Sequence, residues 1–178
     1  MTGKRLMKLF LLFVFSTTSL LYISAYGQQR KPGDEKGESP KYVAMKNRRT
    51  TPNEKSIEKS ITLKTLLEKK DEDDLPTSKA AVLEGYVVQV EKEEDGDFHI
   101  VLADEKRENN TDKWVIVEVT SAWRKRKASL SDARLRRLGD KKIRVTGWLF
   151  YEPEEEHVDP RGTRWELHPV TDIVVIEK

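Results

Sequence analysis

The chain has 178 residues, with 33 Lys and Arg against 31 Asp and Glu, and no cysteine. This length allows one domain with appendages, and the lack of cysteine excludes disulfides, thiol nucleophiles and thiolate metal sites. The balanced charge gives no general argument for a polyanionic partner, and residues 80–178 hold more acidic than basic side chains.

Residues 1–27 have the layout of a secretory signal peptide. Basic residues precede an apolar stretch at 9–23, and the small residues Ala25 and Gly27 stand before Gln28. The alternative is an uncleaved membrane anchor, because the apolar stretch approaches the length of a short span. We expect cleavage, export to the periplasm or out of the cell, and no transmembrane span in the mature chain.

The next two segments are predicted to precede the folded domain. Residues 28–57 are rich in charge, Pro, Gly, Ser and Asn, so they cannot offset their ordering entropy and are expected to be a disordered linker. Residues 58–79 carry a weak helical pattern that ends at Pro76. They predict a short helix docked on the domain or a helical linker segment.

From residue 80 the sequence alternates between apolar and polar positions. Strands are predicted at residues 80–93, 98–104, 113–120, 141–151 and 164–178. A helix is predicted within residues 121–140, capped by Ser129 or Ser131 and ended by Gly139. Alternation groups Val82, Tyr86, Val88 and Val90 on one face of the first strand.

The order of these elements predicts an all-β domain with one helix. Three strands, a helix and two strands over residues 80–178 match a five-stranded OB-fold-like Greek-key barrel (β-β-β-α-β-β). Gly85 and Gly147 stand where the first and fourth strands of such a barrel bend. Another small β-barrel or a β-sandwich is the alternative.

The two loops that flank the usual OB-fold ligand cleft are both acidic. They contain Glu91, Glu93, Glu94 and Asp95 on one side and Glu152, Glu154, Glu155 and Glu156 on the other, with His157 next to the second group. Such a field repels phosphate and favours a cation or a basic partner. It argues against single-stranded nucleic acid, which needs a basic groove with stacking aromatic side chains.

Strand alternation brings together imidazoles and carboxylates. The candidate ligand-binding residues are His99, Glu118, Arg164, Trp165, Glu166 and His168. Asp97, His99, Glu118 and His168 are candidate ligands for a divalent metal cofactor such as Zn²⁺ or Mn²⁺. Alternatively, these groups are exposed or in structural hydrogen bonds, with Trp165 and Leu167 packed inward.

A basic cluster surrounds the predicted helix. Its members are Arg124, Lys125, Arg126, Lys127, Arg134, Arg136 and Arg137. The cluster is either the solvated face of an amphipathic helix or a contact for nucleic acid or an anionic envelope surface, with Trp123 beside it.

Four segments, DGDFHIVL, VIVEVT, GWLFY and RWELHPVT, follow one another along the domain. This order resembles exported bacterial proteins that carry D-x-H-hydrophobic, V-E and W/I-E-L/I-H-P-V motifs. The recurrent positions correspond to Asp97, His99, Glu118, Trp165, Glu166, His168 and Pro169. The resemblance implies an OB-like barrel and export, and it implies no mechanism, because that group has no assigned activity.

We therefore expect an exported, non-enzymatic binding module. Its ligand would be an oligosaccharide, a basic protein surface, or nucleic acid held by the basic helix. The alternative is a metal-dependent hydrolase of phosphodiester or nuclease type, with the His/Asp/Glu group as metal ligands and Arg161 or Arg164 as an anion clamp. A purely structural envelope protein would leave these polar groups without a shared site.

Overall fold

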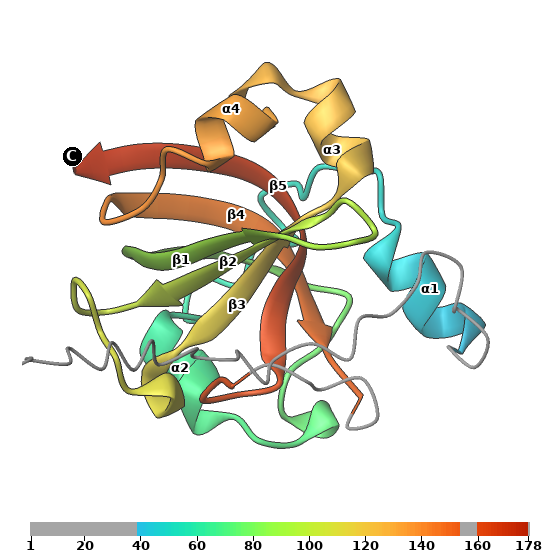
Figure 1. Cartoon of the computed structure of the whole chain (residues 1–178). Coiled ribbons are helices and arrows are strands. Elements are labelled where there is room, and N and C mark those ends of the chain that lie inside the picture. Colours follow the sequence, from blue (N-terminus) through green and yellow to red (C-terminus); the bar gives the residue numbers. More distant parts are fainter. Residues whose placement is uncertain (1–38, 154–159, 178) are drawn as a thin grey trace, which may run out of the picture.

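The computed structural model describes residues 39–153 and 160–177. Its centre is a closed five-stranded barrel with the strand order β1-β2-β3-β5-β4 (Figure 1). The strands are β1 Ala80–Lys92, β2 Phe98–Ala103, β3 Val115–Val119, β4 Lys142–Tyr151 and β5 Trp165–Glu177. Neighbouring strands are antiparallel, except that β3 and β5 close the barrel in parallel. The predicted five-stranded OB-fold-like barrel is confirmed.

The barrel interior is filled by alternate side chains of each strand. Phe98 and Ile100 of β2, Val117 of β3 and Leu167 of β5 lie in one buried core. In β1 the core takes Ala81, Leu83 and Val87, and Val90 is only partly buried against it. A register shift after Val87 breaks the alternation that groups Val82, Tyr86, Val88 and Val90 on one face.

Two glycines are required by close packing. A Cβ at Gly147 would lie 2.9 Å from the Cβ of Leu167, where β4 and β5 lose their regular register. A Cβ at Gly85 would lie 2.6 Å from Cδ1 of Leu63. Leu63 belongs to α2 Leu63–Glu68, which begins after the N-cap Thr62 and buries Leu63 and Leu66 in the barrel core.

The connection between β3 and β4 is broken into short pieces. They are α3 Ser121–Arg126, the 3₁₀ turn η3 Ala128–Leu130 and α4 Asp132–Leu135. The prediction of one continuous helix is therefore wrong, whereas Ser131, one of the two predicted caps, is the N-cap residue of α4, without a capping hydrogen bond from its side chain. Thr120 caps α3 by accepting from the Trp123 N–H, while extended Lys127 separates α3 from η3 and bonds the carbonyl oxygen of Thr171 through Nζ.

Residues 39–57 differ from the predicted linker, because they pack against the barrel. Helix α1 Pro40–Lys46 buries Met45. The Trp123 Nε1–H donates to the Arg48 carbonyl at 2.9 Å, and the Trp148 Nε1–H donates to the Thr50 carbonyl at 2.8 Å. Ile57 then pairs with Ala80 in an isolated parallel bridge. Two tryptophans of the domain thus anchor this segment through its backbone.

Two further 3₁₀ turns, η1 Glu72–Asp74 and η2 Thr111–Lys113, complete the described elements. Within residues 39–153 and 160–177, no helix has the length and apolar character needed to cross a membrane. The predicted signal peptide lies outside these residues.

Candidate functional site

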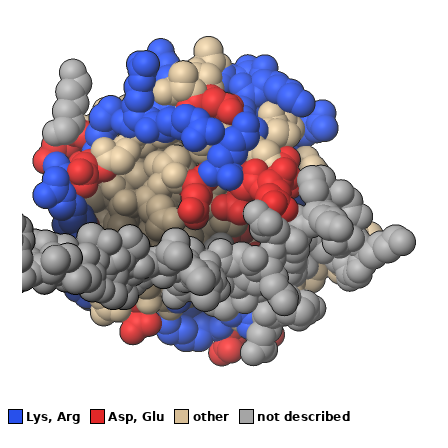
Figure 2. All heavy atoms as spheres, in the orientation of Figure 1, with Lys and Arg blue, Asp and Glu red and all other residues tan. Residues whose placement is uncertain are grey.

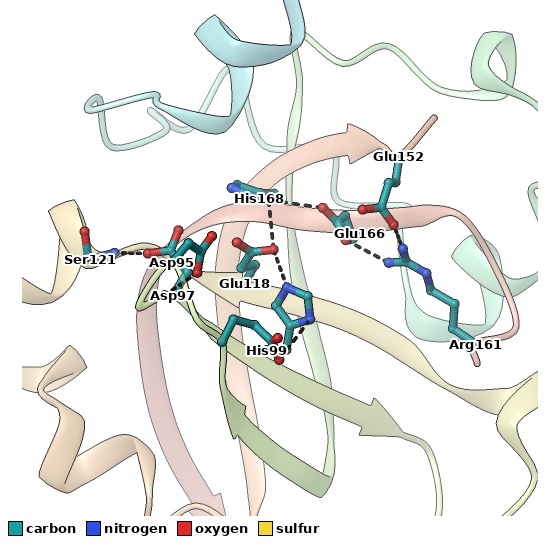
Figure 3. A network of polar contacts seen from close by, with 10 residues as sticks. Asp95, Asp97, His99, Glu118, Ser121, Glu152, Arg161, Glu166 and His168 are labelled. Atoms are coloured by element: carbon teal, nitrogen blue, oxygen red, sulfur yellow. Dashed lines mark hydrogen bonds and ion pairs between the residues drawn. The ribbon is translucent and has the colours of Figure 1, made fainter. Parts of the chain in front are cut away.

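Glu118 is the centre of a polar group on the outer side of the barrel. His99 of β2 and Glu118 of β3 are direct antiparallel partners. Their neighbours Phe98, Ile100, Val117 and Val119 point into the core, so alternation turns both polar side chains outward. The Nε2 atom of His99 lies 2.8 Å from Oε2 of Glu118 (Figure 3).

The closure of the barrel adds a second imidazole. Val117 of β3 pairs with Leu167 of β5, which places His168 beside Glu118. The Nδ1 atom of His168 lies 3.2 Å from Oε2 of Glu118 and 3.1 Å from Oε1 of Glu166. One carboxylate oxygen of Glu118 therefore faces both imidazoles.

Behind His168 the network continues to the loop before β5. Nη1 of Arg161 lies 2.9 Å from Oε2 of Glu166, and Arg161 also pairs with Glu152. Basic and acidic groups thus alternate from Glu152 to His99 (Figure 3). Each buried charge in this row has a partner of opposite sign, as burial demands.

The outer face is covered at this place. Glu118 is 7% exposed, Glu166 2% and His168 3%. The Phe150 ring lies 5.4 Å from the His168 ring, and Tyr42 of α1 packs edge-on against Phe150 at 5.9 Å. The segment that sequence analysis assigned to a linker therefore builds a second layer over β4 and β5.

Asp97 stands at the end of the β1–β2 turn and joins the group from the other side. Its Oδ1 atom accepts a hydrogen bond from the Ser121 N–H at the start of α3. One donor atom from each of Asp97, Glu118 and His168 lies within 4.8 Å of the other two. Asp97 and His99, whose side chain is 22% exposed, are the accessible members of the group.

The charges of the buried members support one another. Burial would raise the pKa of Glu118, but His168 and His99 outweigh it and hold that pKa well below its usual range. Burial would lower the pKa of His168, but Glu118 and Glu166 raise it to about 10. At neutral pH the pair is therefore a carboxylate and an imidazolium.

The pKa of Asp97, unlike that of Glu118, is raised. Burial, together with the nearby negative charge of Glu118, raises the pKa of Asp97 to about 6, despite the hydrogen bond from Ser121. Asp95 adds to this effect. The accessible end of the group therefore has an excess of negative potential.

The structure brings together Asp97, His99, Glu118, Glu166 and His168, the imidazoles and carboxylates predicted as candidate ligands. Two of the candidate ligand-binding residues lie elsewhere. Trp165 is fully buried in the core and donates from Nε1 to the Asp71 carbonyl, whereas Arg164 stacks on Tyr151 and donates to the Glu152 carbonyl. Residues 154–159, which include Glu154, Glu155, Glu156 and His157, lie outside the described part of the chain.

The positioning contacts of Arg161, Glu152 and Ser121 have no counterpart among the predictions from the sequence. Arg161 was considered as an anion clamp, but its side chain is 2% exposed and engaged by two carboxylates. The only hint of the Arg161–Glu166 ion pair in the sequence is that the two residues are five positions apart. This hint is weak, because the turn between them could not be predicted.

The basic cluster is partly structural. Arg124 bonds Asp132 and the Gly96 carbonyl, Lys127 pairs with Asp172, and Arg126 bonds the Arg49 carbonyl. Five members are exposed, and the Arg136 guanidinium lies 5.3 Å from the centre of the Phe98 ring; the exposed members are Lys125, Arg126, Arg134, Arg136 and Arg137. Figure 2 shows lysine and arginine gathered at the top of the molecule, where α3 and α4 lie, with acidic side chains below them.

Among the described residues, this basic face presents no exposed aromatic side chain on which a base could stack. Trp123 is 5% exposed, and the exposed large hydrophobic side chains of the described residues are Val174, Val175 and Ile176, none of them aromatic. Base stacking supplies much of the affinity for single-stranded nucleic acid. Any contact here would rest on charge alone.

Comparison with known proteins gives a distant likeness in fold. No protein-family model and no curated protein sequence matches the chain. Among solved structures, asparaginyl-tRNA synthetase from Entamoeba histolytica is similar in its complex with asparaginyl-adenylate and without it, with TM-scores of 0.43 and 0.42 and 16% identity. Each match covers 62% of this chain and only 23% of the synthetase chain. Nothing about the ligand of this chain follows from them.

Proposed function

We propose that this chain is an exported binding module whose ligand carries positive charge and binds at the rim formed by Asp97, His99 and Glu118. One observation carries this proposal. The Asp97 carboxylate faces Glu118, and no ion pair joins it to a basic side chain in the part of the chain that the structure describes; its partner is the backbone N–H of Ser121.

The electrostatics of the rim favour a cation. Glu118 has counter-charges on its buried side, in His168 and the Arg161–Glu166 pair behind it. The Asp97 carboxylate accepts from the neutral Ser121 N–H, while the Asp97 backbone N–H donates to the Asp95 carboxylate of the acidic β1–β2 turn. A bound positive charge would offset the repulsion between Asp97 and Glu118, whereas a phosphate would increase it.

The same geometry weighs against the phosphodiesterase alternative. Arg161 is buried between two glutamates, and Arg164 rests on Tyr151. Neither guanidinium lies at the rim, so neither serves as a clamp for a substrate phosphate there. A binding role needs no such clamp.

The proposal can be tested by NMR titration of the wild-type protein. The ¹H–¹³C resonances of the His99 and His168 rings would be followed during addition of octalysine, Zn²⁺, Mn²⁺ and a thymidine oligonucleotide in parallel. We expect cations to shift these resonances and the oligonucleotide to leave them unchanged. A response to the oligonucleotide alone, or to none of the probes, would overturn the proposal.

Export is the second part of the proposal and rests on the pattern of residues 1–27. Mass spectrometry of the protein secreted by an expressing cell, or released from its periplasm, should find a chain that begins at Gln28. A chain retained in the membrane with Met1 intact would identify the segment as an anchor.

A further inference from the structure

Asp97, Glu118 and His168 are held as metal ligands usually are. Each residue uses one polar atom for a contact with the protein: Oδ1 of Asp97 with Ser121, Oε2 of Glu118 with both imidazoles, and Nδ1 of His168 with Glu166. Each residue therefore has a second donor atom to offer. These atoms are Asp97 Oδ2, Glu118 Oε1 and His168 Nε2.

We infer that these three residues bind one divalent transition-metal ion. The inference rests on the proposed function, because it names the cation that the rim takes. One donor atom from each of the three residues lies within 4.8 Å of the other two, and metal bonds of about 2.0–2.2 Å need donors somewhat closer. A small inward movement of Asp97, the most accessible of the three, brings the group to that spacing.

The charge and the donor types specify the class of ion. A metal ion would displace the proton that His168 carries in the metal-free protein, and two carboxylates with the resulting neutral imidazole then balance a charge of +2. Mixed nitrogen and oxygen donors suit Zn²⁺ or Mn²⁺, whereas Ca²⁺ and Mg²⁺ prefer sites made of oxygen alone. We therefore expect Zn²⁺ and its spectroscopic substitute Co²⁺ to bind more tightly than Ca²⁺ or Mg²⁺.

The surrounding contacts form the second layer that metal sites require. A ligating histidine commonly donates its other N–H to a carboxylate, as His168 does to Glu166. Arg161 holds Glu166, and His99 holds Glu118. His99, predicted from the sequence as a ligand, is thereby a positioning residue, because its Nε2 contacts the Glu118 oxygen that also contacts His168.

The test is a titration of the full mature chain, after dialysis against a chelator, with Co²⁺ and Zn²⁺. We expect one equivalent of Co²⁺ to give visible absorption bands that Zn²⁺ abolishes. Asp97→Asn keeps an acceptor for Ser121 but loses a charged ligand, so binding should be largely lost. Glu105→Gln, at an exposed acid in the connection between β2 and β3, should leave the affinity unchanged.

Glu166→Gln tests the positioning layer separately. We expect a loss of roughly 10–100-fold in affinity together with a shift of the Co²⁺ bands, which a purely structural defect would not produce. No Co²⁺ or Zn²⁺ binding by the wild type, or equal binding by Asp97→Asn, would overturn the metal site. If octalysine still shifts the His99 resonances in that case, the proposed cation-binding function survives without the metal.

Discussion

Glu118 and His168 form a buried ion pair, 3.2 Å apart, across the parallel junction of β3 and β5. The paired register there consists of Val117 and Leu167 alone, so backbone hydrogen bonds contribute little to this seam. The side chains of the polar network cross it directly. The candidate site and the closure of the barrel are therefore held by the same contacts.

Glu118→Gln should destabilise the fold strongly. The substitution removes the negative charge that faces both imidazoles and leaves His168 with one carboxylate. Breaking a buried ion pair from one side costs roughly 3 kcal/mol or more. Urea unfolding monitored by circular dichroism would measure the change.

Glu84→Gln is the matched control for that variant. Glu84 of β1 pairs with Arg144 of β4, also across neighbouring strands, but both side chains are about half exposed. Such exposed pairs contribute about 0–1 kcal/mol. If the two variants lost the same free energy of unfolding, burial would not increase the contribution of the Glu118 ion pairs to stability.

His168 should keep its proton well above neutral pH. Its pKa is raised to about 10, so folding favours the protonated form. The associated stability is complete below the pKa of the unfolded state, about 6.5, and is lost as the pH rises through about 10. The free energy of unfolding should fall between pH 7 and 10 in the wild type and less steeply in His168→Gln. Parallel pH profiles for the two proteins would contradict this assignment.

Asp97→Asn should make the protein more stable at neutral pH. Burial and the charge of Glu118 raise the pKa of Asp97 to about 6, so folding disfavours its ionised form. This destabilisation is absent below the pKa of the unfolded carboxyl, about 3.9, and complete above about 6. The Tm of Asp97→Asn should exceed that of the wild type at pH 7.5, with no difference near pH 4.

If the wild type and Asp97→Asn had the same Tm at pH 7.5, the ionised Asp97 carboxylate would not destabilise the fold, contrary to this prediction. A gain in stability combined with a loss of cation binding would mark Asp97 as a residue retained for its ligand.

Strand alternation predicted much of the site. Asp97 and His99 are two positions apart, as are Glu166 and His168, so each pair was expected on one strand face. The strands that became β2 and β3 were expected to be neighbours. His99 and Glu118 meet for this reason. Alternation failed in β1, where both faces carry apolar residues and the register shifts after Val87.

The remaining features depend on contacts distant in sequence. His168 reaches Glu118 only because β5 closes the barrel beside β3, and no local pattern encodes that pairing. The Phe150 ring beside His168 packs against Tyr42 of α1, which belongs to a segment whose composition resembles a linker. Its anchors are the carbonyl groups of Arg48 and Thr50, which have no side-chain signature in the sequence.

The packing of α1 gives a last prediction, for Met45→Ala. Met45 is 6% exposed, and its helix carries Tyr42, which packs on the Phe150 ring next to His168. Truncating a buried methionine costs about 2–5 kcal/mol, whereas a residue in a flexible linker would cost nothing measurable. We expect about 2 kcal/mol in urea unfolding, and a red shift of the tryptophan fluorescence as the segment that follows α1 loosens its contacts with Trp123 and Trp148. Arg49→Ala, at an exposed position of the same segment, is the control and should change the free energy of unfolding by less than about 0.5 kcal/mol. Equal, negligible effects of both substitutions would return residues 39–57 to the role of a linker.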